Sequence, residues 1–320
     1  MRVGLYTDHL YRDGQVGTGT SKYIYHLIRE LERLGVEIVP LRKGENPGDV
    51  DVLHDPHAPW NAPLFPRRPL LITIHDMTPF THPQYYDPWI RFLYRQKLRW
   101  FSRRARRILV DSRRTADVVR DAVRPRLPVD VIHLGVEDRF RILPVGPPER
   151  PFLVQVGVHR AIKEPMTTLR AYEEIADRIP HDLHVVGSRG TLVEGMEAYV
   201  ADRPPLRDRV KFYWPGEEGV PVVYNQSSLL VHPCPEEGFG FVPLEALACG
   251  AHVLAAAPAV QEVLGRYACY FEAPSDLGSR VVECLAKPPP TSREERARHA
   301  HSYTFRATAE ATLRAYEAAS

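Results

Sequence analysis

The segment that most constrains the fold of this chain is a strand–loop–helix–strand pattern between residues 228 and 255. Residues 228–231 and 251–255 are short apolar runs of the kind that form buried strands. Between them, Pro243 suits the first turn of a helix, where its missing N–H is no loss, and Gly250 suits the position just after a helix ends. One short helix therefore joins two strands, as in a parallel α/β sheet.

Two carboxylates flank the glycine-containing turn that opens this expected helix. Glu237 lies in the loop, and Glu245 is expected in the first helical turn. Unpaired N–H groups at a helix start, together with the helix dipole, form a site for an anion, most often a phosphate. Acids beside such a site repel a phosphate unless they hydrogen-bond to hydroxyl groups of the same ligand. The pattern therefore indicates a nucleotide sugar, although the dipole alone also favours an acid in a first helical turn.

The string Glu-Gly-Phe-Gly, followed by Pro, Glu-Ala and Cys-Gly over residues 237–250, resembles the donor-site signature of the retaining glycosyltransferases of family 4. That family has the GT-B fold, in which two Rossmann-like, doubly wound α/β domains face a central cleft. The resemblance implies that Glu245 accepts hydrogen bonds from the donor ribose. It also implies that Glu237 holds the donor sugar. The residues that would assist Glu237 are Gly238, Phe239 and Gly240.

The chain opens with a second pattern of the same type. Residues 2–8 and 36–41 are expected strands, and residues 21–34 are an expected amphipathic helix between them. The loop before that helix contains Gly17 and Gly19, and it resembles the family's loop that lies near the donor phosphates. Glycines are also needed in such a loop for tight turning alone, so both interpretations stay open.

Three further residues match positions of the family. His75 ends the apolar run 70–76, and groups at the carboxyl end of a parallel strand face the ligand crevice. The residues alone leave a structural role open for it, whereas the resemblance implies contact with the donor sugar. Lys163 follows the expected strand 152–157 and matches the lysine that neutralises the departing diphosphate. Arg160 is displaced from the family's arginine position, so it is either a second phosphate ligand or a solvated loop residue.

Length and composition predict two domains. A chain of 320 residues exceeds the usual size of a single hydrophobic core. The proline-rich segment 143–151 cannot continue a helix or a central strand. We therefore expect an N-terminal Rossmann-like acceptor-side domain over residues 1–147 and a C-terminal Rossmann-like donor domain over residues 148–301. The resemblance adds a last helix, within residues 302–320, that crosses back to the N-terminal domain.

Charge is distributed unevenly along the chain. Residues 1–148 carry 24 basic and 17 acidic side chains, whereas residues 149–320 carry 18 basic and 23 acidic ones. Residues 91–107 contribute eight basic and no acidic side chains, interleaved with aromatic and aliphatic ones. This segment resembles an amphipathic helix that binds an anionic membrane surface. The alternative is a helix packed on the sheet with a basic outer face. No nucleic-acid reader motif accompanies the segment, so no nucleic-acid partner is predicted.

Nothing at the amino terminus resembles a signal peptide, and no apolar run approaches the roughly 20 residues that span a bilayer. The cysteines match no zinc pattern and are expected as buried, reduced thiols. They are Cys234, Cys249, Cys269 and Cys284. We therefore expect a cytoplasmic protein, peripheral at the inner membrane face if residues 91–107 bind lipid.

Together these features predict a retaining hexosyltransferase that uses a nucleoside diphosphate sugar, GDP-mannose or a UDP-sugar, and an unidentified hydroxyl acceptor. No metal or other cofactor is expected, because Lys163 and the amide groups at the helix start supply positive charge. The alternatives are a nucleotide-sugar epimerase or hydrolase and a non-catalytic nucleotide-sugar binding protein. An epimerase or hydrolase would need no acceptor, and a binding protein would stay inactive with every acceptor.

Overall fold

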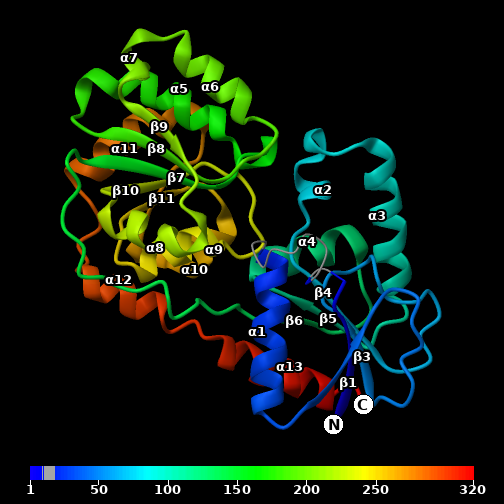
Figure 1. The fold of residues 1–320 in the computed structure, drawn as a ribbon. Coiled ribbons are helices and arrows are strands. Elements are labelled where there is room, and N and C mark those ends of the chain that lie inside the picture. The colour runs from blue at the N-terminus through cyan, green and yellow to red at the C-terminus, as the bar shows by residue number, and fades with distance from the viewer. Residues whose placement is uncertain (9, 11–18) are drawn as a thin grey trace. The chain divides into compact units, whose positions relative to one another are not determined.

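The computed structural model describes residues 1–8, 10 and 19–320 and divides the chain into two compact units (Figure 1). Unit 1 comprises Met1–Gly135 and Tyr303–Ser320, and unit 2 comprises Val136–Ser302. The expected boundary at residue 147 therefore lies inside unit 2.

The segment that precedes this expected boundary packs on unit 2. The Phe140 ring lies 6.0 Å from the Tyr224 ring, measured between centroids. The backbone N–H of Leu143 donates to Asn225 Oδ1 at 2.8 Å. The proline-rich sequence predicted that this segment has no helix or strand. It could not predict which unit the segment packs on, because that depends on these tertiary contacts.

Unit 1 is built on a six-stranded parallel sheet. Its strands are β1 (Arg2–Tyr6), β2 (Glu37–Leu41), β3 (Val52–Asp55), β4 (Leu70–Ile74), β5 (Arg107–Val110) and β6 (Val129–Val131). They pair in the order β2-β1-β3-β4-β5-β6. The chain order reverses between β1 and β3, which creates a topological switch point, where ligands bind at the carboxyl ends of such strands.

Helices cover both faces of this sheet (Figure 1). They are α1 (Gly19–Arg33), α2 (Thr78–Thr81), α3 (Pro88–Phe101), α4 (Arg113–Val123) and α13 (Phe305–Glu317), with the 3₁₀ helix η1 (Pro83–Tyr85). On one face α1 contacts α13. On the other face, α3 and α4 bury Leu98 and Val119 against the strands. Gly135 allows the close approach of α13, because a Cβ at that position would lie 2.1 Å from the backbone nitrogen of Phe305.

Unit 2 is built on a second six-stranded parallel sheet. Its strands are β7 (Phe152–Val158), β8 (Asp182–Ser188), β9 (Val210–Tyr213), β10 (Leu229–His232), β11 (Val253–Ala255) and β12 (Cys269–Tyr270). They pair in the order β12-β11-β10-β7-β8-β9. The reversal, and with it the switch point, lies between β7 and β10.

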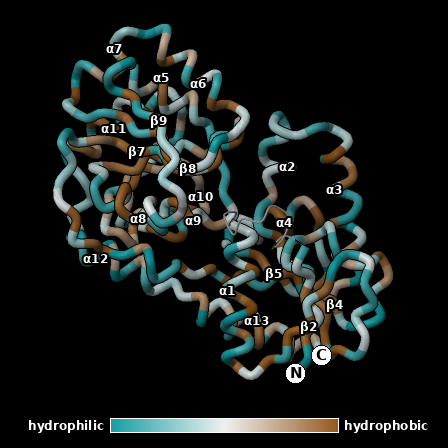
Figure 2. Tube along the Cα trace, in the orientation of Figure 1, coloured by the Kyte–Doolittle hydropathy of each residue, from teal (hydrophilic) through white to brown (hydrophobic). Residues whose placement is uncertain are grey.

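The helices of unit 2 also form two layers (Figure 1). They are α5 (Pro165–Ile175), α6 (Val193–Ala201), α7 (Pro204–Arg207), α8 (Gly216–Gln226), α9 (Phe241–Ala248), α10 (Pro258–Leu264), α11 (Leu277–Ala286) and α12 (Arg293–Ala300). Short 3₁₀ helices are η2 (Ala161–Lys163), η3 (Ala176–Arg178), η4 (Gly265–Tyr267) and η5 (Pro274–Asp276). One core cluster joins Tyr172 of α5, Met196 of α6 and Leu277 of α11 to the strands. Hydrophobic residues follow the strands in both units (Figure 2). The predicted fold class of two Rossmann-like α/β domains is confirmed.

The cysteine expectation is wrong for one pair. Cys269 of β12 and Cys284 of α11 form a disulfide, because α11 packs over this edge of the sheet. Cys234 and Cys249 are buried and unbridged, as expected. The 15-residue separation of the bridged pair gave no sequence signal for pairing.

Within the described part of the chain, every helix is too short or too polar to cross a lipid bilayer.

Candidate functional site

The switch point of unit 2 brings together residues that are far apart in the sequence. Lys163 ends η2, which follows β7, and Glu237 lies in the loop that follows β10. Because β7 and β10 are neighbouring parallel strands, their carboxyl ends lie at the same edge of the sheet. The structure thus places two predicted site residues side by side.

Glu237 is held by two basic side chains. Lys163 Nζ and His232 Nε2 both contact Glu237 Oε1, the latter at 2.9 Å. Burial favours the neutral acid, but the charge of Lys163 and the hydrogen bond from His232 outweigh it and lower the pKa of Glu237 well below its usual range. The side chains of Glu237 and Lys163 are 17% and 36% exposed to solvent. A ligand can therefore reach this ion pair.

The loop between Glu237 and α9 depends on a glycine. Gly240 is the N-cap of α9 and has a φ of 96°, which glycine adopts without strain. A Cβ there would lie 2.6 Å from Val260 Cγ2. The three residues that follow Glu237 are buried; they are Gly238, Phe239 and Gly240. Gly240 provides no side-chain cap for the helix.

Glu245 lies deeper in α9 than predicted. The helix begins at Phe241, so Glu245 falls in the second turn, and the expected first-turn position was wrong. Pro243, the third helical residue, lies in the first turn as expected, and Gly250 lies just after the helix end as expected. Glu245 is only 5% exposed. Burial, followed by the charge of Glu245, raises the pKa of Tyr224 well above its usual range.

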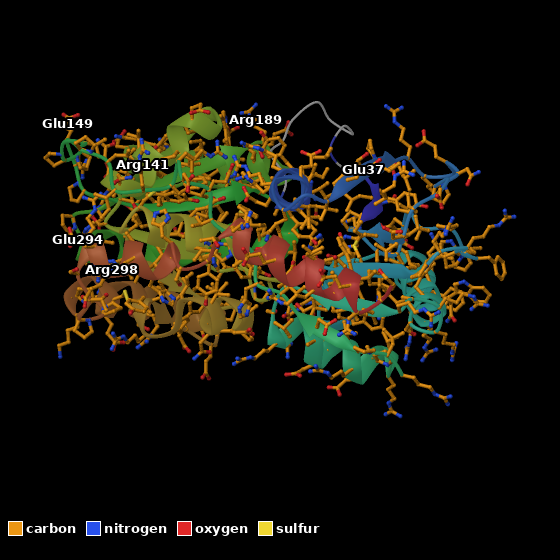
Figure 3. The ribbon with its side chains drawn as sticks, turned by 90° about the horizontal axis from the view of Figure 1, so that it is seen from below. Glu37, Arg141, Glu149, Arg189, Glu294 and Arg298 are labelled. Carbon is orange, nitrogen blue, oxygen red and sulfur yellow. A yellow bond between two sulfur atoms is a disulfide. The ribbon has the colours of Figure 1, made fainter. Side chains whose placement is uncertain are left out.

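Arg160 and Lys163 occupy different environments. Arg160 is the N-cap of η2 and is exposed, whereas Lys163 lies one 3₁₀ turn later and contacts Glu237. Nearby, the guanidinium of Arg189, labelled in Figure 3, lies 5.8 Å from the Trp214 ring centroid. Arg160 contacts Lys163 through its backbone carbonyl, which accepts from the Lys163 N–H at 2.9 Å, and among the described residues its side chain makes no hydrogen bond or ion pair with Lys163 or Glu237.

His232 and Cys234 were missed by the sequence analysis. His232 Nε2, Cys234 Sγ and a Glu237 carboxylate oxygen all lie within 4.8 Å of one another, a grouping that can hold a metal ion. The available signal was a histidine at the end of an apolar strand, four residues before the first acid of the loop.

In unit 1, His75 is engaged at both ring nitrogens. Nδ1 contacts Asp111 Oδ2 at 2.7 Å, and Nε2 contacts the carbonyl oxygen of Pro56 at 2.8 Å. With Asp111 ionised, both partners are acceptors, and the imidazolium form of the ring can donate to each of them. Burial opposes the charge, but Asp111 and the Pro56 carbonyl outweigh burial and raise the pKa of His75. Asp111 follows β5, next to β4, and its position after an apolar strand was the overlooked signal.

A buried polar network lies beneath His75. Tyr316 OH of α13 is 2.7 Å from His54 Nδ1, and His54 Nε2 is 2.7 Å from Thr73 Oγ1. Tyr23 OH lies 3.2 Å from the same Thr73 oxygen, and the Tyr23 ring meets the His75 ring edge-on at 4.9 Å. Burial lowers the pKa of His54 to about 3, so its ring is neutral. Contacts therefore run from α13 to His75.

The remaining predicted residues belong to the first glycine-rich loop. Gly19 is the first residue of α1, which begins two residues before the expected helix. Gly17 lies outside the described residues.

Two family descriptions match the chain. Residues 38–140 match Glycosyltransferase Family 4, and residues 139–274 match Glycosyl transferases group 1. The D-inositol 3-phosphate glycosyltransferase of Mycolicibacterium smegmatis is 29% identical over 210 residues, which are 62% of this chain and 47% of that protein. This chain thus spans about half the length of that relative.

Solved structures share the fold over nearly the whole chain. Sucrose-phosphate synthase (tll1590) from Thermosynechococcus elongatus superposes with a TM-score of 0.81 at 18% identity and covers 99% of this chain and 98% of its own. Anabaena Alr3699/HepE, solved in complex with UDP-glucose, has a TM-score of 0.72 at 15% identity and covers 99% and 100%.

Proposed function

This chain belongs to the group 1 glycosyltransferases with the GT-B fold, and we propose that it is a retaining hexosyltransferase that moves a sugar from a nucleoside diphosphate sugar to a hydroxyl acceptor. One observation carries the proposal: Lys163 and Glu237 meet at the switch point of unit 2, at the loop that opens α9. A cation beside a carboxylate matches a donor that has both phosphates and hydroxyls. The UDP-glucose complex of Anabaena Alr3699/HepE supports this donor class.

The proposed chemistry places new negative charge on the departing nucleoside diphosphate. Lys163 would turn from Glu237 to this phosphate, and the N–H groups at the start of α9 would face the same charge. Arg160, exposed on η2, would add a second cation. Stabilisation aimed at developing charge is usually the largest catalytic term. We assign no metal to this step, because these groups supply the positive charge.

The two acids would hold the hydroxyl groups of the donor. Glu237, released by Lys163, would accept hydrogen bonds from the sugar, together with the backbone of residues 238–240. Glu245 would accept hydrogen bonds from the ribose. Retention follows if the acceptor attacks the same face of the sugar that the diphosphate leaves, with a phosphate oxygen taking the acceptor proton.

Unit 1 would contribute to the donor sugar and the phosphates. The proposed role of His75 requires its Nε2–H to exchange the Pro56 carbonyl for a sugar hydroxyl, while Asp111 keeps the ring oriented. Gly17 and Gly19 keep the phosphate-binding role that the family resemblance implies.

Donor and acceptor can be tested in sequence. UDP, GDP and ADP are first compared by thermal stabilisation, since a ligand at ~100 times its dissociation constant stabilises by about 2.7 kcal/mol. The sugar form of the preferred nucleotide is then incubated with and without acceptors. The first acceptor is D-inositol 3-phosphate, because the Mycolicibacterium smegmatis relative is named D-inositol 3-phosphate glycosyltransferase. Transfer that requires an acceptor supports the proposal. Turnover without acceptor indicates an epimerase or hydrolase, and binding without turnover indicates a non-catalytic protein.

A peripheral membrane contact through α3 is part of the proposal. Trp89, Ile90 and Phe92 are 64%, 48% and 50% exposed at the start of this helix, and Phe65 nearby in unit 1 is 70% exposed. The eight basic side chains of residues 91–107 lie in the same stretch of sequence. Exposed aromatic residues with basic neighbours suit an anionic bilayer surface. A cytoplasmic location at the inner membrane face remains part of the same proposal.

Vesicle flotation tests the contact. The chain should float with phosphatidylserine vesicles and stay behind with neutral phosphatidylcholine vesicles. A double variant, Trp89→Ser with Phe92→Ser, should lose flotation, whereas Val222→Ser, at a site of unit 2 that is 37% exposed, should keep it. Equal flotation of all three proteins would rule out this surface.

A further inference from the structure

A second chemistry is built into the loop that carries Glu237. The sequence from residue 232 reads His-Pro-Cys-Pro-Glu-Glu, so Cys234 stands between two prolines. Its Sγ is fully buried and donates to the carbonyl oxygens of Ile162 and Glu236 at 3.3 and 3.0 Å. His232 is 4% exposed. The proposed transfer reaction uses neither His232 nor Cys234 as a ligand of the donor.

The three donor atoms have the identities that a zinc site needs. Imidazole nitrogen, thiolate sulfur and carboxylate oxygen are the protein ligands of Zn²⁺, at bond lengths of about 2.0 to 2.3 Å. Tetrahedral geometry then puts ligand atoms about 3.6 Å apart. The atoms of His232, Cys234 and Glu237 already lie within 4.8 Å of one another. Side-chain rotation closes the remaining gap, while Pro233 and Pro235 restrain the backbone that carries the sulfur.

We propose that His232, Cys234 and Glu237 bind a thiophilic divalent cation, with zinc as the physiological ion, and that this ion inhibits sugar transfer by taking the Glu237 carboxylate. The inhibitory part rests on the proposed function, whereas the binding part does not. Zn²⁺ would bind neutral His232 through Nε2, with the ring proton on Nδ1. The Cys234 thiol would lose its proton to solvent as the Zn–S bond forms. Lys163, with 36% of its side chain exposed, would turn toward water.

The donor set also predicts which ions fail. Mg²⁺ and Ca²⁺ prefer oxygen ligands and gain little from imidazole or sulfur. The site offers a single side-chain carboxylate beside a cation, Lys163, which opposes a hard ion further. Zinc, cobalt and cadmium should therefore bind, and magnesium should neither bind nor compete.

Cobalt titration of the full chain measures binding without any activity assay. Co²⁺ should give a sulfur-to-cobalt charge-transfer band that Zn²⁺ removes and Mg²⁺ does not. Cys234→Ala should abolish the band, and His232→Gln should weaken cobalt binding by more than about tenfold. Cys249→Ala is the matched control, since Cys249 is the other buried, unbridged cysteine, and it should keep the band. Absence of the band in the parent protein, or its survival in folded Cys234→Ala, overturns the site.

A transfer assay then separates this inference from the proposed function. Zn²⁺ should inhibit the parent enzyme over the concentration range in which it displaces cobalt. Cys234→Ala should stay active and need at least tenfold more zinc for the same inhibition. Zinc binding without inhibition would keep the metal site but remove Glu237 from the transfer reaction. If Glu237→Ala loses transfer but the parent protein binds no metal, Glu237 keeps its role in transfer and the metal site is refuted.

Discussion

Lys163 and Glu237 form an ion pair across 74 residues of sequence, because β7 and β10 are neighbours in the sheet of unit 2. The contact brings together a cation and a carboxylate, to which the proposed function assigns the donor phosphate and the donor sugar. A phosphate can replace Glu237 as the partner of Lys163, and a sugar hydroxyl can replace Lys163 as a partner of Glu237. The ion pair thus holds the two groups side by side, as the proposed donor site requires.

Replacing Lys163 with glutamine should lower kcat for transfer by about 100-fold or more, because it removes the cation assigned to the departing phosphate. Steady-state kinetics with saturating donor measures the effect. Lys287→Gln, at an exposed position of unit 2, should leave kcat unchanged. A kcat for Lys163→Gln equal to that of this control contradicts the assignment.

The two acids should respond differently to alanine substitution. Glu237→Ala should reduce transfer by a large factor, with a modest change in donor affinity, since its contacts are proposed to strengthen in the reaction. Glu245→Ala should chiefly weaken donor binding, by about tenfold or more, because it loses charged hydrogen bonds to the ribose. Donor titration and single-turnover kinetics separate the two effects. Glu272→Ala, on the exposed surface of unit 2, serves as control, and small, equal effects of all three would refute the roles.

His75 should make stability depend on pH. Its pKa is raised in the folded protein, so its charged pair with Asp111 contributes fully below the unfolded value of about 6.5. The contribution declines as the pH rises through the folded-state pKa. The stability difference between the parent and His75→Gln, measured by urea unfolding from about pH 6 to pH 9, should therefore shrink toward high pH. A difference that stays constant over this range would mean that His75 is neutral.

Tyr316→Phe should lower the free energy of unfolding by about 1 to 3 kcal/mol, because it leaves buried His54 without one partner. Tyr25→Phe, on the exposed side of α1 with the residue 40% exposed, should cost less than about 0.5 kcal/mol. Urea unfolding compares the two variants directly. Equal costs would show that the His54 contact contributes nothing specific.

Gly135→Ala should destabilise the chain by about 3 kcal/mol, because its Cβ would collide with the backbone of Phe305 where α13 begins. Gly146→Ala is the matched control, since no other described atom lies within 4 Å of the corresponding Cβ. Thermal unfolding of both variants tests the docking of α13 within unit 1. A Gly135→Ala protein as stable as the control would contradict the contact.

Local sequence patterns predicted a helix or strand correctly where the residues that define it are close together in the sequence. The apolar run 70–76 predicted β4 (Leu70–Ile74), and the proline and glycine around residues 243–250 predicted α9, because both signals act within one element. The four-residue strand β3 (Val52–Asp55) was not predicted, since half of it is polar. His54 and Asp55 are buried because tertiary hydrogen bonds satisfy their side chains. Local spacing also misplaced Glu245 by a turn, because the helix begins at Phe241, so that Pro243 falls in the first turn and Glu245 in the second.

The sequence by itself determined the fold class, through alternating apolar strands and helices, and it identified Glu237 and Lys163 as separate candidates. Only the tertiary structure decided which side chains pair. Glu237 pairs with His232, His75 with Asp111, and Cys269 with Cys284. The physical reason is strand order. Side chains at the carboxyl ends of adjacent parallel strands meet regardless of how many residues separate them, and the order in which strands pair is set by packing of the whole domain.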